Sequence, residues 1–104
     1  MVIYEVDIEI ARGEADPYRK WLAEHVRQML ALPGFTGAEV FEVADPPPAP
    51  GWIALCVQYR LRDRDAPDGY LRDHAARMRA DGIARFGDRL RASRRILHAG
   101  GIPW

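Results

Sequence analysis

Residues 21–29 read WLAEHVRQM, and 49 positions later residues 70–78 read YLRDHAARM. Both segments follow one pattern: an aromatic residue, Leu, a variable position, an acid, His, a small apolar residue, two variable positions and Met. An acid precedes each segment at the same offset, because Asp16 aligns with Asp65. The apolar residues recur at helical spacing, which indicates two amphipathic helices. We therefore expect a chain made of two similar halves.

Four strand patterns surround these helices. Residues 2–10 alternate between apolar and polar, which is typical of a strand with one buried face. Residues 35–43 and 90–98 are also expected to be strands, and residues 52–61 are apolar on nearly both faces, as in a central strand. The order βαββαβ predicts an α+β protein with the ferredoxin-like fold, a four-stranded antiparallel sheet with two helices on one face.

The helix ends are marked by Asp, Pro and Gly. Asp16-Pro17 supplies an expected N-cap and first helical position, and Pro33-Gly34 ends that helix. The second helix is expected to begin at Asp65 and Pro67 and to continue, in broken form, past Gly82.

Two segments have no expected element. Residues 44–51, ADPPPAPG, contain four prolines and predict a stiff loop. Residues 99–104, AGGIPW, form an expected C-terminal tail. Residues 1–98 are therefore interpreted as a single ferredoxin-like domain, because the chain is too short for a second core.

The composition is that of an ordinary globular domain, with 104 residues, 48% of them hydrophobic and 29% charged, and a formal net charge of zero. The zero net charge argues against general polyanion binding. The single cysteine, Cys56, excludes an internal disulfide framework and a Cys-rich zinc site. Acids among the first ten residues are unlike a secretory signal, and no apolar run reaches membrane-spanning length. We expect a cytoplasmic protein without membrane contact.

The two halves carry opposite charge, since residues 1–52 hold nine acids and four bases. In the ferredoxin-like order the first strand lies beside the last. Cross-strand ion pairs are therefore expected between two sets of side chains: Glu5, Asp7 and Glu9 on the first strand and Arg91, Arg94 and Arg95 on the last. The same face carries Trp52, Ala54 and Cys56, so it is not purely polar. Because both helices leave this face open, we expect a homodimer that forms through it.

Four segments carry a resemblance to a known family: IYEVDIEI (3–10), WLAEHVRQMLALPGF (21–35), CVQYRL (56–61) and HAARMRADGIARFGDRLRASRRIL (74–97). With the length and the element order, they resemble a small bacterial family catalogued as a domain of unknown function, over almost the whole chain. That family is similar in fold to dimeric α/β-barrel proteins, which include cofactor-free monooxygenases acting on aromatic polyketides, haem-degrading enzymes and stress-responsive proteins. Fold alone carries little function. No catalytic motif of those enzymes can be placed on this chain residue by residue.

His25 and His74 occupy equivalent positions in the two helix segments. If they meet across the helix pair, with Glu24 or Asp73 as orienting partners, they form a proton relay or half of a metal site. The alternative is that each histidine packs at the edge of the core with one ring nitrogen hydrogen-bonded. Two histidines without a further ligand are a weak metal signal, so we expect no metal.

A cavity between the sheet and the helices is the second candidate feature. The residues expected to line it are mainly aromatic or Met: Tyr4, Trp21, Met29, Tyr70, Met78 and Phe86. The polar groups expected to converge on it, which form the candidate catalytic set, are His25, His74, Tyr59 and Arg79. The alternative is that these side chains simply fill the core of a small domain.

Two hypotheses of different class follow. In the first, the pocket binds a small apolar or aromatic molecule and supports a cofactor-independent oxidation or isomerisation, in which a base ionises the substrate in a dry cavity. In the second, the chain is a non-catalytic dimeric protein-interaction or regulatory module, with a filled core and an apolar patch around Trp52 or Trp104. Nucleic acid is not an expected partner, because Glu5 and Asp7 stand where RNA-recognition motifs present stacking aromatics.

Overall fold

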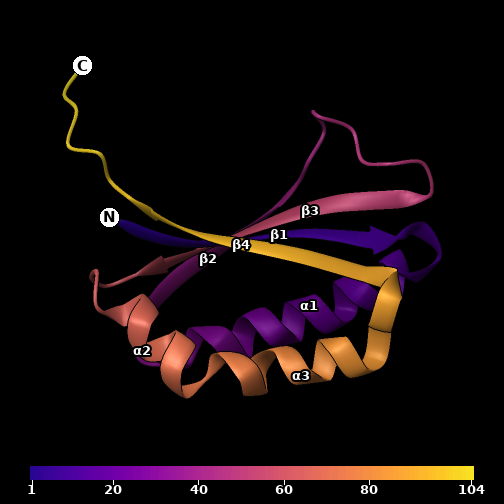
Figure 1. Ribbon diagram of the computed structural model, residues 1–104, viewed down its shortest axis with the longest axis horizontal. Helices are drawn as coiled ribbons and strands as arrows, with labels where there is room; N and C mark the ends of the chain where they lie inside the picture. Colours follow the sequence, from indigo (N-terminus) through magenta and orange to yellow (C-terminus); the bar gives the residue numbers. More distant parts are fainter.

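Four strands form one antiparallel sheet in the computed structural model, which describes residues 1–104. They are β1 (Val2–Ala11), β2 (Phe35–Glu42), β3 (Trp52–Leu61) and β4 (Leu90–His98), in the order β2-β3-β1-β4 (Figure 1). β1 pairs with β3 on one side and with β4 on the other, so that Tyr4 lies between Tyr59 and Ile96. This order and pairing confirm the predicted ferredoxin-like sheet.

The helices cover one face of the sheet (Figure 1). α1 spans Ala15–Leu30, and the second helical region is divided into α2 (Ala66–Asp73) and α3 (Ala75–Phe86). Two 3-10 turns, Arg12–Glu14 and Gly87–Arg89, lead into α1 and into β4. None of these helices has both the length and the hydropathy that a membrane crossing requires.

The second helical region is broken and continues past Gly82 to Phe86, as predicted, but the break lies at His74 and not at Gly82. His74 has φ −131° and ψ −28°, away from helical values, and separates α2 from α3. Gly82 lies inside α3, where an added Cβ would be 2.9 Å from the ring of Trp21. The glycine therefore permits the close approach of α1 to α3 and does not end a helix.

Acidic residues stabilise the starts of α1 and α2 in different ways. Asp16 is not the N-cap of α1, because the helix already begins at Ala15. Asp16 lies in the first turn, where the helix dipole favours a negative charge. At α2 the N-cap is Asp65, as predicted. The side chain that holds this end is Asp63, whose Oδ1 accepts hydrogen bonds from two backbone N–H groups at 3.1 and 3.0 Å.

The hydrophobic core lies between the helices and the inner face of the sheet. It comprises 17 buried residues, among them Tyr4, Ile10, Met29, Val57 and Tyr59. The alternation along each strand places every second side chain in this layer, and the intervening side chains on the open face. Side chains of this core therefore also line any pocket that lies between the sheet and the helices.

β4 carries arginines on both faces of the sheet. On the open face, Arg95 Nε forms an ion pair with Glu5 at 2.5 Å, and the guanidinium of Arg91 lies 3.8 Å from the centre of the Trp52 ring. Arg94 faces the helices, because neighbouring residues of a strand point to opposite faces. The predicted cross-strand ion pairing is confirmed for Glu5 with Arg95. It is wrong for Arg94 and Arg91, and Asp7 and Glu9 form no ion pair either.

Two segments without regular structure rise from the open side of the sheet, away from the helices (Figure 1). One is the loop of residues 44–51 between β2 and β3, which lacks a regular element as its prolines predict. The other is the stretch of residues 99–104 after β4. Its last residue, Trp104, is fully exposed. Both segments stand beside the face that the helices leave uncovered.

Candidate functional site

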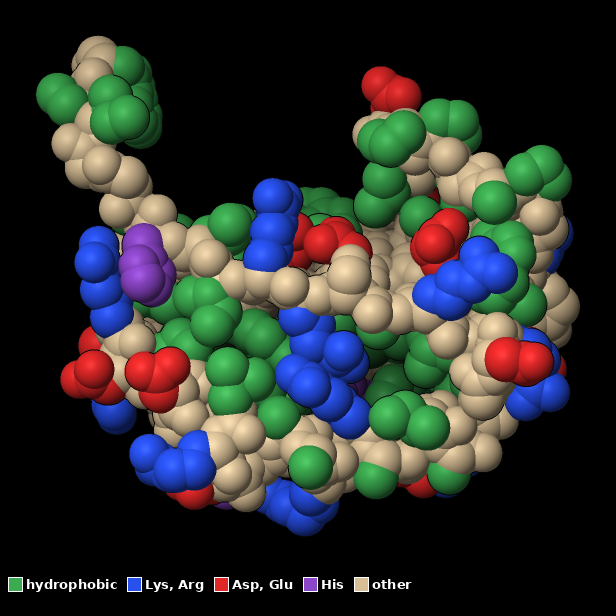
Figure 2. All heavy atoms as spheres, viewed as in Figure 1, with side chains coloured by type: hydrophobic (Ala, Val, Ile, Leu, Met, Phe, Trp, Pro, Cys, Tyr) green, Lys and Arg blue, Asp and Glu red, His purple; other side chains and the backbone are tan.

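A pocket of about 350 Å³ lies between the inner face of the sheet and helices α1 and α3. Figure 2 shows a hollow between β4 and α3, lined by hydrophobic (green) side chains and crossed by basic (blue) ones. Of the 18 residues that line the pocket, 13 are hydrophobic. The core therefore does not completely fill the space between sheet and helices, as the small-molecule hypothesis requires.

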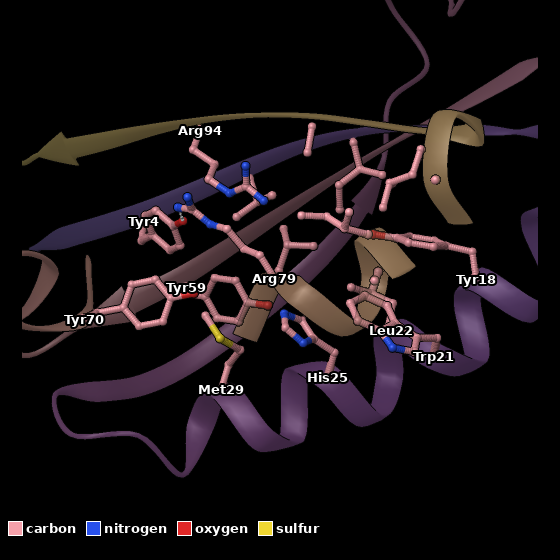
Figure 3. Close-up of a pocket in the computed structure, with 18 residues that line it drawn as sticks. Tyr4, Tyr18, Trp21, Leu22, His25, Met29, Tyr59, Tyr70, Arg79 and Arg94 are labelled. Carbon is pink, nitrogen blue, oxygen red and sulfur yellow. Dashed lines mark hydrogen bonds between the residues drawn. The ribbon is translucent and has the colours of Figure 1, made fainter. Parts of the chain in front are cut away.

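Most of the residues predicted to surround a cavity line this pocket (Figure 3): Tyr4, Trp21, His25, Met29, Tyr59, Tyr70 and Arg79. Met78 and Phe86 do not line it. Both are buried, and they border a more polar hollow between α1 and α3. The reason is that α3 is a separate helix that begins after His74. A single helical periodicity over α2 and α3 therefore predicts the wrong face for residues of α3 such as Met78 and Phe86.

His25 reaches the pocket from α1, with its ring stacked on Trp21 at a centroid distance of 4.5 Å. Trp21 is itself held in place, because its Nε1 donates a hydrogen bond of 2.6 Å to Asp81 Oδ2. Burial, and then the positive charge of Arg94, lower the pKa of His25 below its usual 6.5, against the opposing charge of Asp81. The imidazole is therefore neutral at neutral pH and has one nitrogen able to accept a proton.

His74 does not line the pocket. It lies at the junction of α2 and α3, where its Nδ1 is 2.7 Å from Arg77 Nη2. The two carboxylates expected to orient the histidines are paired with neighbouring arginines, Glu24 at 3.2 Å and Asp73 at 2.9 Å. The structure therefore does not assemble a relay or half of a metal site from His25 and His74.

Tyrosine hydroxyls supply further polar groups to the pocket. Burial raises the pKa of Tyr59 above its usual 10 and raises that of Tyr70 to about 12. Both side chains are therefore neutral hydroxyls that can donate a hydrogen bond to an anion. Figure 3 shows the Tyr59 hydroxyl pointing toward His25. The hydroxyl of Tyr4 accepts a hydrogen bond of 2.8 Å from Arg79 Nη2.

Arg79 and Arg94 provide the guanidinium groups of the pocket, one from α3 and one from β4. Figure 3 shows both side chains directed into the space between sheet and helices. Arg94 was not predicted as a pocket residue. The alternation of side chains along residues 90–98 nevertheless predicts its position, because Leu90, Ala92 and Arg94 share one face of the strand. All three line the pocket.

A second group of titratable side chains lies on the open face, where the possible metal-ligating atoms of Glu5, Asp7 and Cys56 are within 4.8 Å of one another. The carboxylate of Glu5 accepts hydrogen bonds from Arg95 and Gln58, and Arg95 lowers its pKa to about 2. Burial raises the pKa of Asp7, and it raises that of the Cys56 thiol to about 12. This cluster is an ion-pair network beside a protonated thiol, which is not a nucleophile.

The sheet order and the helices on one face define a domain of the ferredoxin-like class. Within that class, residues 1–99 match the family described as Domain of unknown function (DUF4286), and the chain belongs to this family. No curated protein matches the sequence.

Solved structures with the same fold span nearly the whole chain. A proposed antibiotic biosynthesis monooxygenase from Deinococcus radiodurans is 15% identical, with a TM-score of 0.72, and covers 99% of this chain and 96% of its own. The cofactor-independent oxygenase SnoaB from Streptomyces nogalater is 13% identical, with a TM-score of 0.63 and coverages of 97% and 95%. The heme-degrader MhuD from Mycobacterium tuberculosis, with two hemes bound, is 17% identical, with a TM-score of 0.66 and full coverage of both chains. At such low identity these similarities show the fold.

Proposed function

We propose that the chain binds a small apolar or aromatic molecule in the pocket between sheet and helices, and that it acts on this molecule without a cofactor, with His25 as the base. The observation that carries the proposal is the neutral imidazole of His25 in a largely apolar pocket that also holds two guanidinium groups. A base in such a site removes a proton, and nearby positive charge stabilises the anion that results.

The proposed first step transfers a proton from an acidic C–H bond of the ligand to His25. The electron pair stays on the ligand as an enolate, which the Tyr59 hydroxyl and the positive charge of Arg79 stabilise. If the proton returns to a different atom, the net reaction is an isomerisation. If the anion reacts with dioxygen, a peroxide forms, takes up the proton and loses water, so that a CH2 group and O2 become a C=O group and H2O.

The proposed catalytic set contains His25, Tyr59 and Arg79 and leaves out His74, because His74 does not line the pocket. SnoaB, described as a cofactor-independent oxygenase, supports this class of chemistry at the level of the fold.

Hydrogen–deuterium exchange tests the proposal, because proton removal is the step that both reactions share. In D2O we expect the protein to accelerate exchange of the acidic C–H hydrogens of 2-tetralone, a two-ring apolar ketone, as followed by NMR. His25→Gln is expected to lower the catalysed rate by about 100-fold or more. In the wild-type protein the rate should fall as the pH drops through a pKa below 6.5, because a protonated imidazole cannot act as a base.

His98→Gln is the matched control, because His98 is exposed at the end of β4 and does not line the pocket. This variant should keep the wild-type exchange rate, and circular dichroism verifies that both variants are folded. An unchanged rate in His25→Gln, or no acceleration by the wild-type protein, would contradict the proposal.

We further propose that two copies of the chain pack through their open sheet faces. The support is an apolar strip on that face, where Phe41 is 42% exposed and lies opposite Cys56. The loop of residues 44–51 and the tail of residues 99–104 rise beside the face (Figure 1), and Figure 2 shows hydrophobic side chains on both. A cytoplasmic location is also proposed, supported by the free thiol of Cys56 and testable by cell fractionation.

A further inference from the structure

The two arginines of the pocket lack a counter-ion. Arg79 and Arg94 take part in none of the ion pairs of the protein. None of the 18 residues that line the pocket is Asp or Glu. Two like charges that face the same largely apolar space repel each other, and Arg79, which is half-buried, also loses part of its hydration. An anion in the pocket would reduce both costs.

Arg79 has hydrogen-bonding capacity that the protein does not use. Its Nη2 donates to the hydroxyl of Tyr4 at 2.8 Å, whereas its Nε is buried and has no hydrogen-bond partner. A buried donor without an acceptor is costly and is uncommon in folded proteins. Nε itself is closed off from the pocket, but Arg79 is half-buried and lines the pocket, so its remaining guanidinium N–H groups are available to an acceptor on a ligand.

Arg94 approaches the same space from β4, at the exposed edge of the sheet. Burial is the main influence on the pKa values of Tyr59, Tyr70 and His25, and the positive charge of Arg94 lowers all three. The field of Arg94 therefore extends through the pocket and attracts a negative group to the space that these side chains enclose.

We infer that the ligand of this pocket is an apolar or aromatic molecule that carries one carboxylate, held by Arg79 and Arg94. The inference rests on the proposed small-molecule function and specifies its substrate class. A planar guanidinium group matches the two oxygens of a carboxylate. The 13 hydrophobic lining residues accommodate the remainder of the molecule. One carboxylate compensates one of the two positive charges, so the other remains to stabilise the anion that forms when His25 removes a proton.

Titration calorimetry with a matched pair of probes tests this inference. 2-Naphthoate and 2-naphthamide share the same two-ring body, and only the first carries a charge. We expect the wild-type protein to bind 2-naphthoate about 10-fold or more tightly than 2-naphthamide. Arg94→Gln should weaken 2-naphthoate binding about 10-fold and should change 2-naphthamide binding by less than about 2-fold. Arg79→Gln provides a second, independent test with the same expected direction.

Arg91→Gln is the matched control for Arg94→Gln, because Arg91 lies on the same strand and faces the open side of the sheet. It should leave the binding of both probes unchanged. Equal affinity for the two probes would overturn the carboxylate inference and leave the small-molecule pocket standing. Tighter binding of 2-naphthyl phosphate than of 2-naphthoate would also overturn it, in favour of a phosphate ester. If the wild-type protein binds none of these probes, both the inference and the proposed function fail.

Discussion

Glu5 is the one charged side chain that the fold buries, at 3% exposed, and it pairs with Arg95 across the sheet. Because this partner lowers the pKa of Glu5 from 4.5 to about 2, the ionised carboxylate stabilises the folded state. The contribution is complete above a pH of about 4.5 and is lost as the pH falls through about 2. We predict that Glu5→Gln lowers the free energy of unfolding by about 1–2 kcal/mol at pH 7 and by less at pH 2.

Urea unfolding at a fixed protein concentration measures this difference. Asp7→Asn is the contrasting variant, because burial and the neighbouring Glu5 raise the pKa of Asp7, so that its ionisation opposes folding. We expect no loss of stability from Asp7→Asn at pH 7. If Glu5→Gln destabilises the protein equally at pH 7 and pH 2, the charge of Glu5 is not the cause.

The inward position of Arg94 could have been deduced from the sequence. Even-numbered residues of β4 lie opposite even-numbered residues of β1, which form the buried face of that strand. Arg94 was instead expected on the open face, because the acids of the first strand there could form ion pairs with it. The pocket itself could not be predicted, because the same apolar side chains can fill a core, and its volume depends on how 18 residues pack.

At the scale of the element, the two helical glycines of α2 and α3 have opposite roles. An added Cβ at Gly69 meets nothing closer than 3.9 Å, whereas at Gly82 it would lie 2.9 and 3.1 Å from atoms of the Trp21 ring. Trp21 cannot easily move aside, because Asp81 holds its Nε1. We predict that Gly69→Ala stabilises the protein by about 0.5–1 kcal/mol, and that Gly82→Val destabilises it by about 1–3 kcal/mol.

Thermal and urea unfolding of the two variants provide the measurement, and near-ultraviolet circular dichroism reports on the packing of Trp21. Gly82→Ala is an informative intermediate, because its gain in helix propensity opposes the contact with Trp21. A stabilisation by Gly82→Ala as large as that by Gly69→Ala would refute the close approach of α1 to α3 at this position.

Strand bounds were predicted to within one residue, whereas the break between α2 and α3 was not. The strands are delimited by Pro and Gly, as in the loop of residues 44–51 before β3. No Pro or Gly lies at the break at His74, and its neighbours Asp73 and Ala75 are both tolerated inside helices. Local sequence therefore carried no signal for it, and the only nearby signal, at Gly82, belongs to a contact between helices.

At the scale of the whole molecule, the proposed dimer predicts a solution mass of twice the 11.8 kDa chain. Phe41 and Val40 are both exposed on β2, and they point to opposite faces, because Phe41 pairs with Cys56 and Val40 with Val57. Light scattering should therefore show that Phe41→Asp shifts the protein toward the monomer, while Val40→Asp remains dimeric. A monomeric wild-type protein, or the same shift in both variants, would rule out association through the open face.

The element order and the sheet order followed from the sequence because two patterns agreed: strand alternation in four segments and a repeated helix in two. Interaction between chains lies beyond such patterns. The open face carries the buried carboxylate of Glu5 and apolar side chains such as Phe41. Faces of such mixed composition occur both on solvent-exposed surfaces and in protein interfaces, so the sequence does not decide whether a second chain covers this one.

The three tryptophans occupy three separate regions of the molecule. Trp21 is stacked on His25 in the pocket, Trp52 lies beneath Arg91 on the open face, and Trp104 ends the exposed tail. The chain therefore carries one natural fluorophore for each of the regions in which a ligand, a second copy or a further contact would bind. In a variant that keeps only one of the three tryptophans, the fluorescence of that indole would report the association in its own region, without an attached dye.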